Sequence, residues 1–565
     1  MRTLRWPWFL SDRGVLALAC TVFGIGILAL VAMLLIAADV TGDERAKLQI
    51  EAIKYGLGFF AASGAAAALL LAVRRQRLSE HTHELELLKH AHTEADATER
   101  RVTDLYTKAA EQLGSADAAV RLAGLYALER VAQNNAGQRQ TIVNVLCAYL
   151  RMPYTPPMPP ARAADASPPG LPLPGPGLVT ADARLARQEL QVRMTAQRIL
   201  STHLRLPADV EPHQAALLRP DPHQPFWPGM DVDLTGAALV NWDGDQGHVR
   251  RAGFGSVTFH GTASFAAATF TGAADFAGAR FSGDARFPEA VFTDQATFGH
   301  VSVAGFADFN QAAFADDVSF RDATFHGVAD FTDATFSQGA WFRTAAFHVN
   351  VEFRAASFHL EADFRGATFR DNAGFREVVF AAKADFDRAR FSGIGWFSGA
   401  QFGGTAWFRK TRFSDVVSFD RACFGADARF RRADFAGDAT FRAVTFDGTA
   451  EFSGVSFSAE ATFDGAAFAA GAWFGEGNFG GGISFRTATF ADVAWFNDAI
   501  FSGDAGFDQA TFASDSSLEH ARVLARDGRH DTWPPGWVYM PAADFGRLLS
   551  VPAAARSAGR PERQG

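Results

Sequence analysis

The sequence predicts a β-solenoid that is preceded by a two-helix transmembrane hairpin and a small α-helical region. Three observations predict these parts: two long apolar runs near the N-terminus, a stretch rich in Glu, Leu, Lys and Arg after them, and phenylalanine on an eleven-residue period in the second half. The 565 residues exceed one ordinary hydrophobic core, which agrees with several folded units or a solenoid.

The overall composition excludes few classes of protein and does not indicate a class of binding partner. The formal net charge of −9 is mild for this length. Cys20 lies in an apolar run, while Cys147 and Cys423 are far apart, so neither a disulfide framework nor a CxxC metal site is predicted. A reducing compartment fits this pattern. We expect no cofactor and no bound metal.

Two apolar runs predict the hairpin. Residues 14–38 carry no charge and are long enough to cross a hydrocarbon core, and residues 55–73 form a shorter run with more small residues. A signal peptide is the alternative for the first run, but that run is longer than an ordinary apolar signal region and a second run follows it. We therefore predict transmembrane helices at 14–38 and 55–73, joined by a short extracytoplasmic loop at 39–54.

The charges beside these runs predict the orientation. Lys and Arg are retained on the cytoplasmic side of a membrane. Arginines flank the hairpin on its outer sides, at Arg2, Arg5, Arg13, Arg74, Arg75 and Arg77. The sequence therefore predicts a cytoplasmic N-tail at 1–13 and a multi-pass protein of the cell membrane, with both termini and the solenoid in the cytoplasm.

Residues 74–151 predict a helical module. Its first part is a polar helix, which Gly114 ends, and Ser115 is the expected cap of the next helix. That next helix has an apolar stripe, which we expect to be buried, at Val120, Leu122, Leu125, Leu128 and Val131. Residues 141–150 are expected to pack against it as a short antiparallel bundle.

A linker and a cap follow. Residues 152–180 are too rich in proline to form a packed element and predict an extended, semi-stiff linker. Residues 181–230 begin with an Arg-rich helix, with Leu185, Val192 and Ile199 on one face, and this segment is expected to cover the start of the solenoid.

Phenylalanine then recurs with steps of five and six residues. One series runs from Phe254 by elevens to Phe507 and the other from Phe259 by elevens to Phe512, and Val303 is the one exception among these 48 positions. An eleven-residue period is also typical of right-handed coiled coils. A five-residue step would turn a helix by about 140° and separate the two series, and Gly, Asp, Thr and Ser are too frequent between them. Helix is therefore disfavoured.

The residue two positions before each Phe is small, usually Ala. A small and a large inward residue on a short extended side, followed by a corner, is the pattern of a β-solenoid. We expect the Phe series to form a ladder in its core, with members such as Phe254, Phe259, Phe265, Phe270, Phe364, Phe369, Phe375, Phe380, Phe507 and Phe512.

This pattern resembles the pentapeptide-repeat family, whose unit is Ala-(Asp/Asn)-(Leu/Phe)-x-x. Units such as ADFRG at 362–366 and ATFRD at 367–371 match it, and Leu234 and Leu239 have its five-residue spacing. The resemblance covers about 231–525 and implies a right-handed quadrilateral β-helix. The extra residue in alternate units, 5+6 instead of 5+5, departs from the family and affects the corners. The order of the parts also resembles a membrane-anchored subgroup of this family with actinobacterial character. In this order two spans come first, LYTKAAEQLG and VRLAGLYALERVAQ follow, and the repeats come last.

Four sides per coil require two eleven-residue units, hence 22 residues. Residues 251–511 then form about 12 coils, with neighbouring strands about 4.8 Å apart. Residues 526–565 are expected to form a C-terminal cap, with aromatic residues folded over the last coil, and a disordered tail.

No catalytic pattern emerges, so we predict a protein without enzymatic activity and without catalytic, cofactor-binding or metal-binding residues. The order of parts predicts a membrane-anchored scaffold that presents the β-helix to an unknown protein partner. The alternatives are a DNA mimic that modulates an enzyme such as gyrase, as the resemblance to the family implies, and a rod that binds the anionic membrane surface. Residues 251–514 carry 31 acidic and 21 basic residues, a net of −10, and arginines are concentrated near their centre. We therefore expect neither an unbroken anionic face nor a nucleic-acid partner.

Spacing by 22 residues places several arginines on one edge. They are the candidate partner surface: Arg321, Arg343, Arg365, Arg409 and Arg431, interrupted by Asp387. Arg354, Arg376 and Arg442 lie along another edge, and Trp341, Trp407, Trp473 and Trp495 along a third. These edges are either surfaces for an acidic partner or lipid, or solvated corners neutralised by nearby Asp and Glu.

Overall fold

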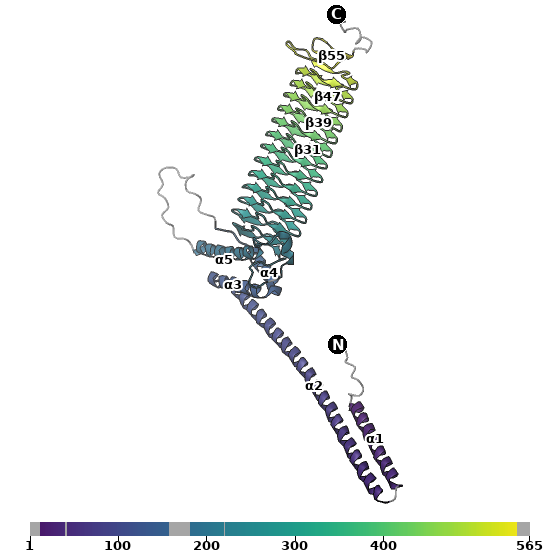
Figure 1. Ribbon diagram of the computed structural model, residues 1–565. Helices are drawn as coiled ribbons and strands as arrows, with labels where there is room; N and C mark the ends of the chain where they lie inside the picture. The colour runs from purple at the N-terminus through teal and green to yellow at the C-terminus, as the bar shows by residue number, and fades with distance from the viewer. Residues whose placement is uncertain (1–11, 40–41, 158–180, 220, 551–565) are drawn as a thin grey trace. The chain divides into compact units, whose positions relative to one another are not determined.

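The computed structural model describes residues 12–39, 42–157, 181–219 and 221–550 (Figure 1). It contains two compact units, Met1–Leu105 and Tyr106–Gly565. Most of the predicted N-tail, most of the predicted linker and the predicted disordered end lie outside the described residues.

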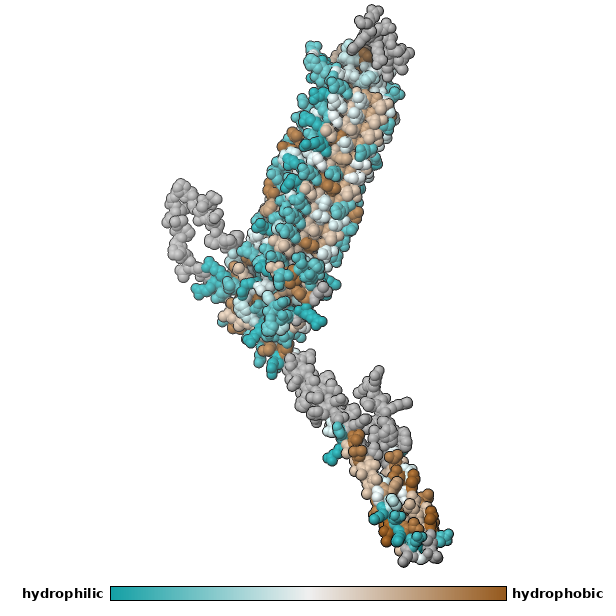
Figure 2. Space-filling model, viewed as in Figure 1, coloured by the Kyte–Doolittle hydropathy of each residue, from teal (hydrophilic) through white to brown (hydrophobic). Residues whose placement is uncertain are grey.

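The first unit contains α1 (Asp12–Ala38) and most of α2 (Asp43–Leu113). Within them, Leu16–Ala38 and Glu44–Val73 are long and apolar enough to cross a membrane. Hydrophobic side chains cover much of the described surface of these two segments (Figure 2). The helices approach closely, since a Cβ on Gly56 would lie 2.8 Å from Leu30 Cδ1.

The helix α2 begins earlier than the predicted second span. Residues 43–54, which were expected to form a loop, are helical. The reason is composition: this segment contains no Gly or Pro and is rich in Ala, Glu and Lys, which favour helix. The helix ends at Leu113, directly before Gly114, as predicted.

The second unit opens with a helical cap. It contains α3 (Ala118–Asn134), η2 (Ala136–Gln138), α4 (Arg139–Arg151), α5 (Ala181–Leu204) and η3 (Pro212–Leu217). Asp117, and not Ser115, caps α3, because its Oδ1 accepts the N–H of Ala119 at 2.8 Å. Ser115 Oγ accepts the N–H of Asp117 instead.

The buried faces of the cap helices are shorter than predicted. Leu125, Leu128 and Val131 are buried in α3, as expected, but Leu122 is only half-buried and Val120 is 37% exposed. Leu185 is 58% exposed, whereas Val192 and Ile199 are buried. The two exposed residues, Val120 and Leu185, lie in the first turns of their helices, before the buried part of each helix begins. Hydrophobic spacing alone does not show where a neighbouring element ends.

The three long helices pack on one another and on the first strands of the solenoid, so they form one cap. The sequence predicts instead a module at 74–151 apart from a cap at 181–230. Two glutamines explain the difference. Gln140 of α4 donates to the carbonyl of Asp231 and accepts its N–H, both at 2.8 Å. Gln197 of α5 does the same with Val240, at 2.8 and 3.0 Å.

These amides replace the next strand at the open edge of the first coil. An exposed strand edge leaves backbone N–H and C=O groups unpaired and invites aggregation. Each glutamine side chain satisfies one donor and one acceptor there, and α4 and α5 cover the edge.

The solenoid has four sides, and on each side the short strands of successive coils pair in parallel to form a sheet (Figure 1). The first sheet has 14 strands, from β1 (Asp231–Asp233) to β52 (Ser516–Ser517), and the second has 16, from β2 (Ala238–Val240) to β54 (Trp537–Met540). The third sheet has 12 strands, from β6 (Ala263–Ser264) to β50 (Ala505–Gly506). The fourth has 13, from β3 (His248–Val249) to β51 (Thr511–Phe512). Most strands contain two residues. The result is a β-solenoid of about 13 turns.

The register between coils is 22 residues, as predicted. For example, Ala362 of β24 (Ala362–Asp363) pairs with Ala384 of β28 (Ala384–Asp385), 22 positions on. The first coil is shorter, because Asp231 pairs with Arg251, 20 positions on. This matches the plain five-residue spacing at the start of the repeats.

The Phe series fills the interior. Nine of the ten ladder residues named above are buried, and Phe512, in the last coil, is partly exposed. Rings 22 residues apart, which lie in neighbouring coils on the same side, stack nearly parallel, as Phe342 and Phe364 do at 4.8 Å between centroids. Rings across the coil meet edge to face, as Phe353 and Phe364 do at 5.4 Å and 87°. Both arrangements are favourable for aromatic pairs.

Two kinds of corner produce the alternating spacing of five and six residues between successive phenylalanines. The five-residue step from Phe386 to Phe391 crosses a two-residue turn, in which the N–H of Ala389 donates to the carbonyl of Phe386 at 3.0 Å. The second residue of this turn, Arg388, has a φ of 59°. The six-residue step from Phe391 crosses a wider corner at 392–394, where no φ is positive. The extra residue therefore avoids a left-handed conformation, which costs a non-glycine residue about 1–2 kcal/mol.

The C-terminal end is covered as predicted. Trp533 packs on Phe501 and Phe507 at centroid distances of 5.3 and 6.3 Å. The strands β54 and β55 (Phe545–Ser550) form an antiparallel hairpin that pairs with β53 (Arg522–Leu524). Arg529 donates to the carbonyls of Phe501, Ser502 and Gly503 at this end of the solenoid.

Candidate partner-binding surface

All five arginines of the predicted edge lie at one corner of the solenoid. We call it the first corner: the two-residue turns that join the first sheet to the second. Each arginine is the first residue of such a turn, and the residue after it, which is the second of the turn, has a positive φ. The five are Arg321, Arg343, Arg365, Arg409 and Arg431. Asp387 holds the same place in its coil.

Two of these arginines are held by carboxylates. Arg365 donates Nε–H to Asp363 Oδ1 at 2.8 Å. Arg409 donates Nε–H to Asp387 Oδ2 at 2.9 Å, and Asp387 also accepts the backbone N–H of Arg409. Arg431 lies 4.0 Å from Glu451. For Arg321 and Arg343 the described residues include no ion-pair partner within 4.0 Å.

Buried charges shape the sheet beside this corner. Asp363 and Asp385 are each 1% exposed. The hydrogen bonds to Asp363 raise the pKa of Arg365 above its ordinary value. Burial raises the pKa of Asp385. Lys383 donates to Glu361 at 3.0 Å and lies 3.1 Å from Asp385, and these carboxylates outweigh its burial and raise its pKa.

A second column of cations stands beside the first, and the sequence analysis did not find it. Arg388, Lys410 and Arg432 are the second residues of three successive turns, with φ values of 59°, 57° and 56°. All three are exposed, and within the part of the chain that the structure describes none has an ion-pair partner within 4.0 Å. The signal was present in the sequence as a cation at each of 388, 410 and 432, spaced by 22 residues.

Two grooves run along this corner. One has a volume of about 290 Å³ and is lined by six charged residues, Asp387, Arg388, Arg409, Lys410, Arg431 and Arg432. The other has a volume of about 510 Å³ and includes Arg343, Arg365, Lys383, Arg390 and Trp407. They share Asp387, Arg388 and Arg409, so they form one continuous feature.

Trp407 forms part of the wall and is surrounded by cations. Arg409 lies 3.9 Å, Lys383 4.7 Å and Arg429 5.3 Å from its ring centroid. Such cation–π contacts stabilise the cations where they lie. The ring is therefore a support for the charged side chains.

The other predicted edges are also present. Arg354, Arg376 and Arg442 lie at the opposite corner, between the third and fourth sheets, where Arg376 stacks 4.1 Å from the Trp396 ring. Trp341, Trp407, Trp473 and Trp495 share one column of the first sheet. Of these, Trp473 and Trp495 are 40% and 46% exposed and stack on each other at 5.9 Å.

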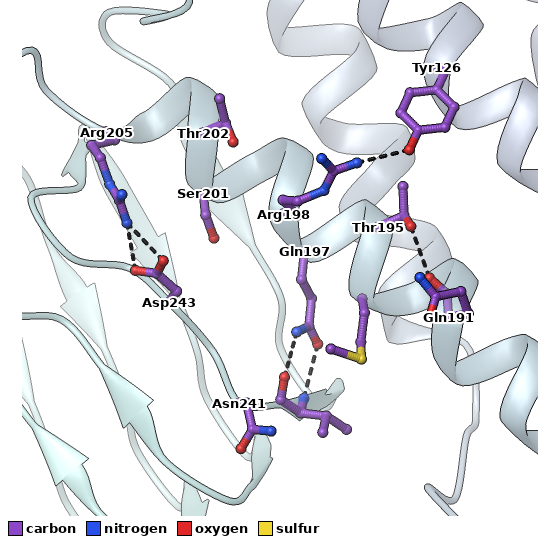
Figure 3. A pocket seen from close by; sticks show the side chains of 12 residues that line it. Tyr126, Gln191, Thr195, Gln197, Arg198, Ser201, Thr202, Arg205, Asn241 and Asp243 are labelled. Atoms are coloured by element: carbon purple, nitrogen blue, oxygen red, sulfur yellow. Dashed lines mark hydrogen bonds and ion pairs between the residues drawn. The ribbon is translucent and has the colours of Figure 1, made fainter.

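A further hollow of about 320 Å³ lies where α5 meets the first coil (Figure 3). Its side chains bond to one another: Arg205 donates to both oxygens of Asp243, and Arg198 donates to the hydroxyl of Tyr126 at 2.9 Å. Gln197 makes its two backbone bonds in the same place. These contacts join the cap to the solenoid.

Among the described residues, no group of three or more His, Cys, Asp or Glu side chains is arranged to hold a metal ion. The features that the structure does offer are a charged corner and exposed sheet faces on a rigid frame.

A four-sided stack of parallel sheets around a Phe ladder defines a β-solenoid repeat protein, built as a scaffold. The family model described as pentapeptide repeats (9 copies) matches residues 254–302, 287–335, 309–357 and 397–445. The chain is a pentapeptide-repeat protein. No curated protein and no solved structure matches it.

Proposed function

We propose that this protein is a non-enzymatic scaffold, anchored in the cell membrane, which presents its solenoid to a protein partner. The observation that carries this proposal is the solenoid itself. Its interior is filled by Phe and Ala side chains, so its outer corners and sheet faces remain for binding. Pentapeptide-repeat β-helices are generally structural or interaction proteins.

The membrane anchor is supported by α1 and the first part of α2. Their apolar segments have mean hydropathies of 2.7 and 2.0, and almost none of their residues are buried within the protein. An exposed apolar surface of this length is stable in a hydrocarbon core and costly in water. The flanking arginines favour both ends of the hairpin on the cytoplasmic side.

Cell fractionation tests the anchor. The full chain should sediment with membranes and resist extraction by carbonate or high salt, and a chain without residues 1–75 should move to the soluble fraction. A truncated chain that stays in the membrane pellet contradicts the anchor. Cysteine accessibility on either side of the hairpin tests the orientation.

DNA mimicry is the weaker candidate because a duplex mimic needs an unbroken anionic face. The first corner instead gathers cations over successive coils. The full chain in neutral detergent should therefore leave DNA supercoiling by gyrase unchanged, and inhibition at stoichiometric concentrations would favour the mimic.

A further inference from the structure

We propose that the first corner, from Arg343 to Arg432, binds an extended acidic segment of a partner protein. This inference rests on the proposed scaffold function and names the chemistry of the partner. Its first support is unneutralised charge. Arg343, Arg388, Arg390, Lys410 and Arg432 all line the two grooves, and among the described residues none has a carboxylate within 4.0 Å.

Two other cations of the corner, Arg365 and Arg409, are fixed in position. Arg409 is tied to Asp387 through two side-chain nitrogens and packs on Trp407. Arg365 is tied to buried Asp363. Fixed side chains lose little conformational freedom when a ligand arrives, so they contribute charge at small entropic cost.

The length of the corner suits a short peptide. The turns that contain Arg343 and Arg431 are four coils apart, since 431 − 343 is four times 22. At about 4.8 Å per coil this is about 19 Å, the length of about six extended residues. The smaller groove is lined by charged residues alone, so it offers charge and no apolar pocket.

The patch has ends, and this argues against a membrane surface as its ligand. Along the second column of turn residues, the three cations at 388, 410 and 432 are followed by Gly454, Glu476 and Asp498, and preceded by Gly366, Thr344 and Asp322. A rod lying on anionic lipid would need cations along its whole edge. A local patch with acidic residues beyond both ends matches a segment of limited length.

Nucleic acid is also a poor match. Sequence-independent binding of single strands combines a cationic groove with aromatic rings on which bases stack. The ring of Trp407 is already in contact with Arg409, Lys383 and Arg429. A carboxylate-bearing chain needs no stacking surface.

The repeat itself provides variants that should fold. Gly366 and Gly454 occupy the second turn position in neighbouring coils, each with a φ of 66°. The triple variant Arg388→Gly, Lys410→Gly and Arg432→Gly therefore removes three charges without changing the turn. The matched control, Arg354→Ser, Arg376→Ser and Arg442→Ser, removes three charges from the opposite corner, where Ser398 holds the same position.

The test is fluorescence anisotropy of a labelled hexaglutamate peptide with the full chain in a neutral detergent. We expect saturable, salt-sensitive binding that weakens about tenfold in the glycine variant and less than about twofold in the control. Absence of binding, or equal loss in both variants, overturns the proposal.

Two further arms use the same variants with phosphatidylserine vesicles and with an oligo-dT strand of equal charge. Tighter binding of either probe, with loss in the glycine variant, would assign the corner to lipid or nucleic acid and overturn the proposal. The scaffold function is tested separately, by whether the neighbours of the protein in cells depend on the solenoid.

Discussion

Phe364 and Phe386 stack with their centroids 4.8 Å apart and their planes at 0°. They are 22 residues apart in the sequence and neighbours in the core. Phe364 also stacks on Phe342 and meets Phe353 and Phe375 edge to face, so one ring supports three successive coils.

Replacement of Phe364 by Ala should therefore destabilise the centre of the solenoid. Removal of a buried Phe side chain costs about 3–5 kcal/mol, because packing is lost and a cavity remains. Urea denaturation followed by circular dichroism measures the loss. Phe512→Ala in the last coil is the control and should cost clearly less, since Phe512 is partly exposed. Equal costs would contradict a continuous ladder.

Val303 interrupts the ladder between Phe281 and Phe325, with which it pairs in register. The variant Val303→Phe should raise stability by about 1–2 kcal/mol, because it adds buried apolar area and two ring stacks. The same denaturation measurement checks this gain. A loss of stability would show that the coils have closed around the smaller side chain.

Glu352 should lower stability at neutral pH. Burial raises the pKa of this carboxyl above its ordinary value of 4.5, and one of its oxygens has no hydrogen-bond partner. A folded-state pKa that is raised means that protonation favours folding, so stability rises as pH falls through that pKa. Glu352→Gln should therefore increase the melting temperature at pH 7.

The gain from Glu352→Gln should vanish below pH 4.5, where the carboxyl is protonated in the folded and the unfolded chain alike. Glu460→Gln, at an exposed position, is the control and should have no effect at either pH. A glutamine variant that melts lower at pH 7 would contradict this account of Glu352.

Cys147 should be inert in the folded cap. It is 1% exposed, and burial raises the pKa of its thiol to about 12. Because the thiolate is the nucleophile, maleimide at pH 8 should label Cys423, which is partly exposed, well before Cys147. Gln140→Ala removes both hydrogen bonds by which this side chain holds α4 on the first coil, and it should speed labelling of Cys147. Fast labelling of Cys147 in the unmodified chain would contradict a closed cap.

The sequence predicted the repeats better than their ends. A strict spacing of Phe determines the register, because any slip would move rings out of the core at every coil. The caps had no such repetition. Gln140 and Gln197 are single polar residues on helices, and nothing in their spacing shows that they pair with a strand edge.

The candidate surface was predicted in part for a similar reason. The 22-residue spacing placed Arg321 to Arg431 on one edge, but not which of them are neutralised. That depends on side chains from neighbouring coils, such as Asp363 for Arg365 and Asp387 for Arg409. The cations at 388, 410 and 432 also have the 22-residue spacing, but the turn geometry shows that they form a second exposed column beside the first.

The most direct test of the scaffold is proximity labelling in intact cells, with the labelling enzyme fused to the C-terminus. The comparison is a chain that lacks residues 343–452, which are five whole 22-residue coils. This deletion joins Phe342 to Ser453 in register and keeps both caps. The account predicts that specific neighbours of the full chain are lost from the shortened one. Identical sets of neighbours would show that the centre of the solenoid is a spacer and would contradict its role as the binding surface.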